Sequence, residues 1–147
     1  MKIAIASDHR GVEYKKQIIE YLESKAHLPL DCSPINNPTD DYPDFAFSVC
    51  EKVVNNEAEI GILVCRTGIG MSIAANKVKG IRCAKINSID DAILSRNDNG
   101  ANVMTFNYTE NIETIKKYID AFISAEVIND DRHQRRVDKI KAYEESH

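Results

Sequence analysis

The stretch of sequence that decides the fold lies near the middle of the chain, at residues 60–72. It reads Ile60-Gly61-Ile62-Leu63-Val64-Cys65-Arg66-Thr67-Gly68-Ile69-Gly70-Met71-Ser72. Its first five residues form a continuous apolar run with the length of a strand buried on both faces. A glycine-containing turn follows at once, and residues 70–78 read as a helix. This stretch therefore predicts one strand–turn–helix unit of a parallel α/β fold.

The same alternation continues in both directions along the chain. Short strands are predicted at residues 3–6, 28–30, 60–64, 81–86 and 102–106. Helices are predicted at residues 11–25, 43–55, 70–78, 88–96, 112–123 and 131–145. Because strands that alternate with helices form a covered parallel sheet, we predict a doubly wound five-stranded sheet in a three-layer α/β/α fold. No repeat or long linker interrupts the pattern, so residues 1–147 are predicted to form a single domain.

Composition and charge argue against several classes of partner. The chain has 147 residues and a net charge of −4, so no overall positive field attracts nucleic acid or anionic lipid. No apolar run approaches the ~20 residues that span a bilayer. The N-terminal segment becomes polar too soon for a signal peptide. We therefore expect a cytoplasmic protein with no nucleic-acid and no membrane partner.

The four cysteines are predicted to be free thiols. Cys32, Cys50, Cys65 and Cys83 form no C-x-x-C pair, and none neighbours a histidine at metal-ligand spacing. Cys50 and Cys83 lie among apolar residues and are interpreted as part of the core. The sequence therefore predicts no metal site, and Cys65 alone has a setting that suggests chemistry.

Three polar clusters are predicted at strand ends, where open parallel sheets bind ligands. They are residues 7–11, residues 65–72 and residues 98–102. In the second cluster, glycines let the backbone approach a ligand, and the N–H groups of a helix start favour an anion and the thiolate form of Cys65. The alternative is that the glycines only shape a turn and that Cys65 is buried. The spacing matches neither a Walker loop nor a dinucleotide-binding glycine motif.

Two further groups have both a functional and a structural interpretation. Asp8 and His9 could hold a hydroxyl and a phosphate, or Asp8 could simply cap the following helix. Arg132 and Arg136 share a helix face and suit a phosphate dianion. The alternative for this C-terminal cluster is a solvated charged face in which the arginines pair with neighbouring aspartates. The helix at about 131–145 is so polar that we expect it to pack against another subunit rather than lie loosely on the surface.

These segments together resemble the family of ribose-5-phosphate isomerase type B and galactose-6-phosphate isomerase, over almost the whole chain. The resemblance rests on Ile5-Ala6-Ser7-Asp8-His9 with Gly11, Asp41-Tyr42-Pro43-Asp44, Leu63-Val64-Cys65, residues 67–77, Gly80-Ile81-Arg82, Ser95-Arg96, Asn99, Ala101-Asn102-Val103 and residues 132–137. It implies a Rossmann-like or flavodoxin-like sheet, a homodimer that can pair into tetramers, and no metal or organic cofactor. It further implies that the C-terminal helix packs on the partner subunit.

The resemblance also implies a reaction and a set of site residues. Cys65 would remove the C2 proton of an open-chain aldose phosphate to form a cis-enediolate, most simply from ribose 5-phosphate to ribulose 5-phosphate, with Thr67 assisting proton movement between O1 and O2. The other expected contacts are Asp8, His9, Gly68, Gly70, Met71, Ser72, Asn99, Arg132, His133 and Arg136, some of them from the partner subunit.

Three positions depart from the family pattern. Arg66 stands where the family usually has glycine; it could crowd the pocket or add a phosphate or carboxylate contact, and it is counted among the substrate-binding residues. Asp98 stands where the family has a histidine linked to ring opening, and it is assigned the catalytic role there. Asn107-Tyr108-Thr109 replaces a glycine-rich turn with an arginine. The alternative to an active isomerase is therefore a weakly catalytic or inactive binding subunit of a hetero-oligomer of the galactose-6-phosphate type. A nucleotide-binding or signalling module would leave Cys65 and Thr67 unexplained.

Overall fold

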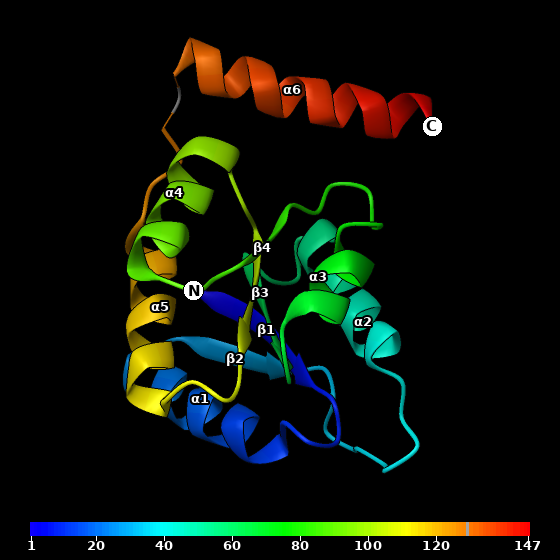
Figure 1. Ribbon diagram of the computed structural model, residues 1–147, viewed down its shortest axis with the longest axis vertical. Coiled ribbons are helices and arrows are strands. Elements are labelled where there is room, and N and C mark those ends of the chain that lie inside the picture. Colours follow the sequence, from blue (N-terminus) through cyan, green and yellow to red (C-terminus); the bar gives the residue numbers. More distant parts are fainter. Residues whose placement is uncertain (129) are drawn as a thin grey trace.

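The computed structural model describes residues 1–128 and 130–147, and it contains one five-stranded sheet with helices on both faces (Figure 1). The strands are β1 (Lys2–Ser7), β2 (Leu28–Asp31), β3 (Ile60–Cys65), β4 (Cys83–Lys85) and β5 (Val103–Asn107). The helices are α1 (Val12–Ser24), α2 (Tyr42–Val54), α3 (Ile69–Ala75), α4 (Ile89–Asn99), α5 (Ile112–Ser124) and α6 (Asp131–Ser146). All strand pairs are parallel, in the order β2-β1-β3-β5-β4, which confirms the predicted doubly wound fold class.

Two elements are shorter than the sequence predicts, because asparagine side chains take over backbone hydrogen bonds. The Asn76 amide donates to Ser72 O and Cys83 O and accepts from Cys83 N. These bonds end α3 at Ala75 instead of residue 78. Asn102 accepts from Arg82 N in the same way, so β4 begins at Cys83 instead of residue 81.

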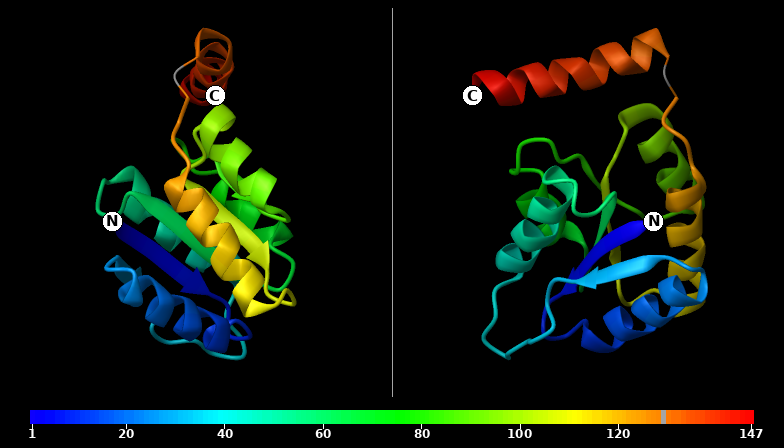
Figure 2. Two further views of the ribbon diagram at one scale, coloured as in Figure 1. Left: turned by 90° about the vertical axis from the view of Figure 1, so that its left-hand side faces the viewer. Right: turned by 180° about the vertical axis from the view of Figure 1, so that it is seen from behind.

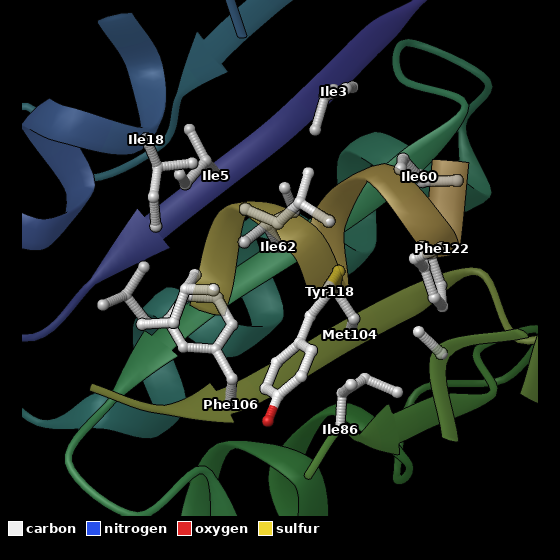
Figure 3. Close-up of a cluster of buried hydrophobic side chains, with 14 of the residues drawn as sticks. Ile3, Ile5, Ile18, Ile60, Ile62, Ile86, Met104, Phe106, Tyr118 and Phe122 are labelled. Atoms are coloured by element: carbon white, nitrogen blue, oxygen red, sulfur yellow. The ribbon is translucent and has the colours of Figure 1, made fainter. Parts of the chain in front are cut away.

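The two faces of the sheet bury side chains of different size. Along β1, Ile3 and Ile5 point to the layer of α1, α4 and α5, while Ala4 and Ala6 point to the layer of α2 and α3. Figure 3 shows the first cluster, in which isoleucines from the strands meet Tyr118 and other large side chains. The small residues on the second face let α2 pack close to β1 and β3.

Helix α6 is set apart from the other helices, beside the C-terminal end of α4 (Figures 1 and 2). Val137 is the one buried residue of this helix. Its start is capped by Asp130, which accepts from Arg132 N and His133 N, and its end is held by Glu144, which accepts from Gly80 N. Ile140 and Tyr143 are exposed, so α6 presents apolar side chains that this chain does not cover.

Within the described residues, no helix is long and apolar enough to cross a membrane.

The close packing of α2 on β3 makes Gly61 sensitive to any side chain. A Cβ atom at Gly61 would lie 2.5 Å from Val49 Cγ1 and 3.2 Å from Val103 Cγ2. We therefore expect Gly61→Ala to lower the free energy of unfolding by about 1–3 kcal/mol through overpacking, as measured by urea denaturation. Val49→Ala removes the Val49 methyl group that clashes. The double variant should therefore lose less free energy of unfolding than the two single variants lose in sum. Strict additivity would show that the clash is not the cause.

Candidate functional site

The carboxyl ends of β1 and β3 bring two of the predicted clusters together. The strands are adjacent, with Ser7 opposite Val64, so the turn that carries Asp8 and His9 lies beside the turn that carries Cys65 and Thr67. The chain leaves these neighbouring strands toward opposite sides of the sheet, which is where doubly wound folds form their ligand sites. Cys65 is 7% exposed, so its thiol is almost fully shielded from bulk solvent.

The turn after Cys65 is fixed by its backbone. Gly68 has a φ of +77°, and a Cβ atom there would lie 3.1 Å from both Phe106 O and Thr105 Oγ1. Buried Thr105 donates its hydroxyl to Gly68 O at 3.0 Å, and Thr67 Oγ1 accepts from Ile69 N at 3.1 Å. The glycine is therefore required by both conformation and space, and the turn is held in one shape.

The first residues of α3 differ in burial, because Ile69 is exposed whereas Met71 is buried. The side chain of Met71 is fully buried in the core and does not face the site. At Gly70, a Cβ atom would lie 2.7 Å from the ring of Tyr42, which comes from the first turn of α2 and is 42% exposed. Tyr42 therefore borders the site. The sequence interpretation gave Tyr42 no role. An aromatic residue in the first turn of a helix that begins at the carboxyl edge of the sheet is a signal that could have identified it.

The side chain of His9 is held by a residue that sequence reasoning missed. His9 Nδ1 lies 2.7 Å from Asp40 Oδ1, and Asp40 is only 9% exposed. Burial would raise the pKa of Asp40, but hydrogen bonds from His9, Asn36 and Asn37 outweigh it and hold the pKa below its usual range. Asp40 lies in a loop 31 residues further along the chain, so no local pattern links it to His9.

Asp8 shapes the turn before α1 but is not the cap of that helix, because the cap position is Gly11 and no side chain caps it. Asp8 Oδ1 accepts from Gly11 N at 2.9 Å and from Arg10 N at 3.1 Å, which fixes the turn before α1. These bonds use one oxygen of the carboxylate. The other is compatible with the predicted contact to a ligand hydroxyl.

The third predicted cluster does not lie at the same edge of the sheet. Asp98 and Asn99 form the end of α4, which runs back to the amino end of β5, and Arg82 Nε donates to Asn99 O just before β4 begins. The expectation that residues 98–102 lie at a ligand-binding strand end is therefore wrong. The cluster precedes its strand, and only loops that follow a strand open on the carboxyl edge.

The start of α6 lies at this amino edge as well. Asp98 Oδ1 is 3.5 Å from His133 Nε2, which joins α4 to α6 next to Arg132 and Arg136. A strand such as β3, with six residues, is about 20 Å long. Within one chain, the α4–α6 group is therefore separated from Cys65 by about the length of the sheet.

The arginines of α6 are not neutralised by the acids around them. Asp130 caps the helix, and Asp138 accepts from Gln134. In the parts of the chain that the structure describes, neither Arg132 nor Arg136 makes an ion pair, and the same holds for exposed Arg66. This observation weighs against the interpretation of a self-paired charged face and favours an external anion.

Comparison with known proteins places this chain in a family. Residues 3–140 match the family model described as Ribose/Galactose Isomerase. The chain belongs to this family. Among curated relatives, a probable ribose-5-phosphate isomerase B of Mycoplasma genitalium is 44% identical over 146 residues, which cover 97% of this chain and 95% of the relative. A putative sugar phosphate isomerase of Bacillus subtilis is 41% identical, covering 99% of this chain and 98% of the relative.

Solved structures of the family agree with the fold described above. A crystal structure of ribose-5-phosphate isomerase B from Mycoplasma genitalium with bound ribulose-5-phosphate has a TM-score of 0.92 at 42% identity, covering 99% of this chain and 97% of that one. The Clostridium thermocellum enzyme has a TM-score of 0.94 at 37% identity and covers 99% of each chain. The resemblance that the motifs carry is therefore confirmed.

Proposed function

We propose that this member of the ribose/galactose isomerase family is an aldose–ketose isomerase that interconverts ribose 5-phosphate and ribulose 5-phosphate. The observation that carries the proposal is the position of Cys65. It ends a buried strand, precedes a rigid glycine turn, and lies beside the turn of Asp8 and His9. The relatives named ribose-5-phosphate isomerase B, one of them seen with ribulose-5-phosphate, support the choice of substrate. The four free thiols suit a reaction in the cytoplasm.

The side chains and backbone N–H groups at the carboxyl edge of the sheet can carry out the steps of this isomerisation. The thiolate of Cys65 removes the C2 proton of the open-chain aldose, and the electrons move onto O1 to form a cis-enediolate. Backbone N–H groups of residues 68–72 stabilise the oxygen that gains negative charge. The hydroxyl of Thr67 helps to move a proton between O1 and O2. The proton held by Cys65 returns to C1, which gives the ketose with no net change in oxidation state.

Binding of the phosphate needs groups from both edges of the sheet. His9 lies at the carboxyl edge, whereas Arg132, Arg136 and Asn99 lie at the amino edge. We assign these arginines to the phosphate and Asn99 to the sugar, and they reach the Cys65 site of a second copy. The site then forms between the two subunits of a homodimer. The exposed apolar side chains of α6 are part of the contact.

Ring opening is assigned to Asp98 together with His133. The carboxylate of Asp98 faces His133 Nε2 at 3.5 Å, so the acid can orient the imidazole, and the imidazole can accept or donate a proton. This pair takes the place of the single family histidine that Asp98 replaces.

The function of Cys65 is tested by isotope exchange. Cys65→Ala should slow the exchange of the C2 proton of ribose 5-phosphate with solvent deuterium by at least about 10²-fold, since a positioned base contributes that much or more. Calorimetric binding of ribulose 5-phosphate should persist, because the phosphate contacts remain. Undiminished exchange in the variant would exclude Cys65 as the base. Binding without turnover in the unaltered protein, on both ribose 5-phosphate and galactose 6-phosphate, would favour the binding-subunit alternative.

Sharing of the site between subunits is tested by complementation. Cys65→Ala and the double variant Arg132→Ala/Arg136→Ala should each be inactive alone. When the two are refolded together, half of the dimers carry one protomer of each kind, and each such dimer has one undamaged site. About one quarter of the unaltered activity should return. If the mixture stays inactive while mixed dimers are detected by mass spectrometry, the site lies within one chain.

The pair of Asp98 and His133 is tested with two substrates. Asp98→Asn should lower kcat on ribose 5-phosphate by about 10²-fold, the lower end of general acid–base effects. Erythrose 4-phosphate cannot form a furanose ring, because its O4 is phosphorylated. Its turnover, where accepted, should change little. Equal losses on both substrates would mean that Asp98 does not act in ring opening.

A further inference from the structure

The loop between β2 and α2 holds a buried acid against a site residue. Asp40 Oδ1 contacts His9 Nδ1 at 2.7 Å and His9 N at 3.4 Å. Its Oδ2 accepts from Asn36 Nδ2 at 3.2 Å and from Asn37 N at 3.1 Å. Asn36 Nδ2 also donates to Ser7 O at 3.0 Å, the last residue of β1. The carboxylate is therefore the centre of a network in which Asn36 Nδ2 and the backbone N–H groups of His9 and Asn37 donate to it.

This arrangement determines which ring nitrogen of His9 carries a proton. An ionised carboxylate only accepts hydrogen bonds, so the nitrogen that faces Asp40 must be Nδ1–H. The opposite nitrogen, Nε2, is left for a ligand. In the neutral ring Nε2 has a lone pair, which repels a phosphate oxygen, and only the protonated ring presents an N–H there. The anionic carboxylate at 2.7 Å stabilises that protonated ring.

We propose that Asp40 is a positioning residue that fixes the Nδ1–H tautomer of His9 and makes His9 a cationic contact for the phosphate of the substrate. The assignment of phosphate to His9 rests on the proposed function, whereas the tautomer does not. Asp8, the other acid beside His9, binds Gly11 N and Arg10 N through Oδ1, so Asp40 is the acid that is bonded to the ring.

The two oxygens of the Asp40 carboxylate have different partners, so matched variants can separate the contact with His9 from the contacts with the loop. Asp40→Ala removes the bonds to both His9 and the loop. Asn36→Ala removes one loop donor and leaves Asp40 Oδ1 on His9. Asp41→Asn removes the neighbouring negative charge from an exposed residue whose side chain does not cap α2. Asp40→Asn is a second, conservative variant that keeps the shape of the side chain. The asparagine amide has one acceptor oxygen, so it cannot accept hydrogen bonds from His9, Asn36 and Asn37 together.

The test reads the tautomer by NMR of ¹⁵N-labelled full-length protein, with His9→Gln to assign its signals among the four histidines. The unaltered protein, Asn36→Ala and Asp41→Asn should show Nδ1–H in the neutral ring. Asp40→Ala should shift to the Nε2–H form that free histidine prefers. In Asp40→Asn, the population of the Nδ1–H tautomer should lie between those of the unaltered protein and Asp40→Ala. With inorganic phosphate as the probe, both nitrogens of the unaltered His9 should become protonated. Asp40→Ala should bind phosphate about tenfold more weakly.

Steady-state kinetics separate the possible failures. Asp40→Ala should raise the KM for ribose 5-phosphate about tenfold with kcat changed less than about threefold, as expected for loss of uniform binding. An Nε2–H tautomer in the unaltered protein, or a tautomer that Asp40→Ala and Asp40→Asn leave unchanged, would overturn the inference even if turnover is normal. If the tautomer and phosphate results are as expected but ribose 5-phosphate is not turned over, the role of Asp40 stands and the proposed function fails.

Discussion

The direction of the parallel sheet constrains everything else in this protein. In an all-parallel sheet, each loop that follows a strand opens at one edge, and each loop that follows a helix opens at the other. Cys65 ends a strand, and Asp8 and His9 follow one, whereas Asn99 and the start of α6 lie at the opposite edge. No rearrangement of side chains joins groups that are separated by the length of the strands. In the function proposed above, a second copy of the chain brings the α6 arginines to Cys65.

Small residues on one face of the sheet connect core packing to the site. Ala4, Ala6 and Gly61 let α2 lie close to the strands, and this approach places Tyr42, at the start of α2, against Gly70. The glycine turn is thus bounded by an aromatic ring on one side and by β5 on the other. The shape of the site therefore depends on side chains that are chosen for packing as much as on those that face a ligand.

The charged side chains differ in whether they have a partner within the chain, in a protein whose net charge is −4. Several acids at the two edges of the sheet are occupied: Asp40 by His9, Asp98 by His133, and Asp130 by the start of α6. The basic side chains of Arg132 and Arg136 have no such partner among the residues described. Both arginines are thus available for the phosphate contact that we propose, because these acids are committed to a helix cap and to histidines.

The sequence by itself determined which segments form strands and helices, and that a glycine turn follows Cys65. These features depend on neighbours within a few residues, and hydrophobic periodicity reports them. Only the tertiary structure decided that residues 98–102 lie at the amino edge, that Asp98 faces His133, and that Asp40 binds His9. Each of these depends on how separate elements pack and on the course of a loop between residues 32 and 41. Contacts across 31 residues leave no periodic signal in the chain.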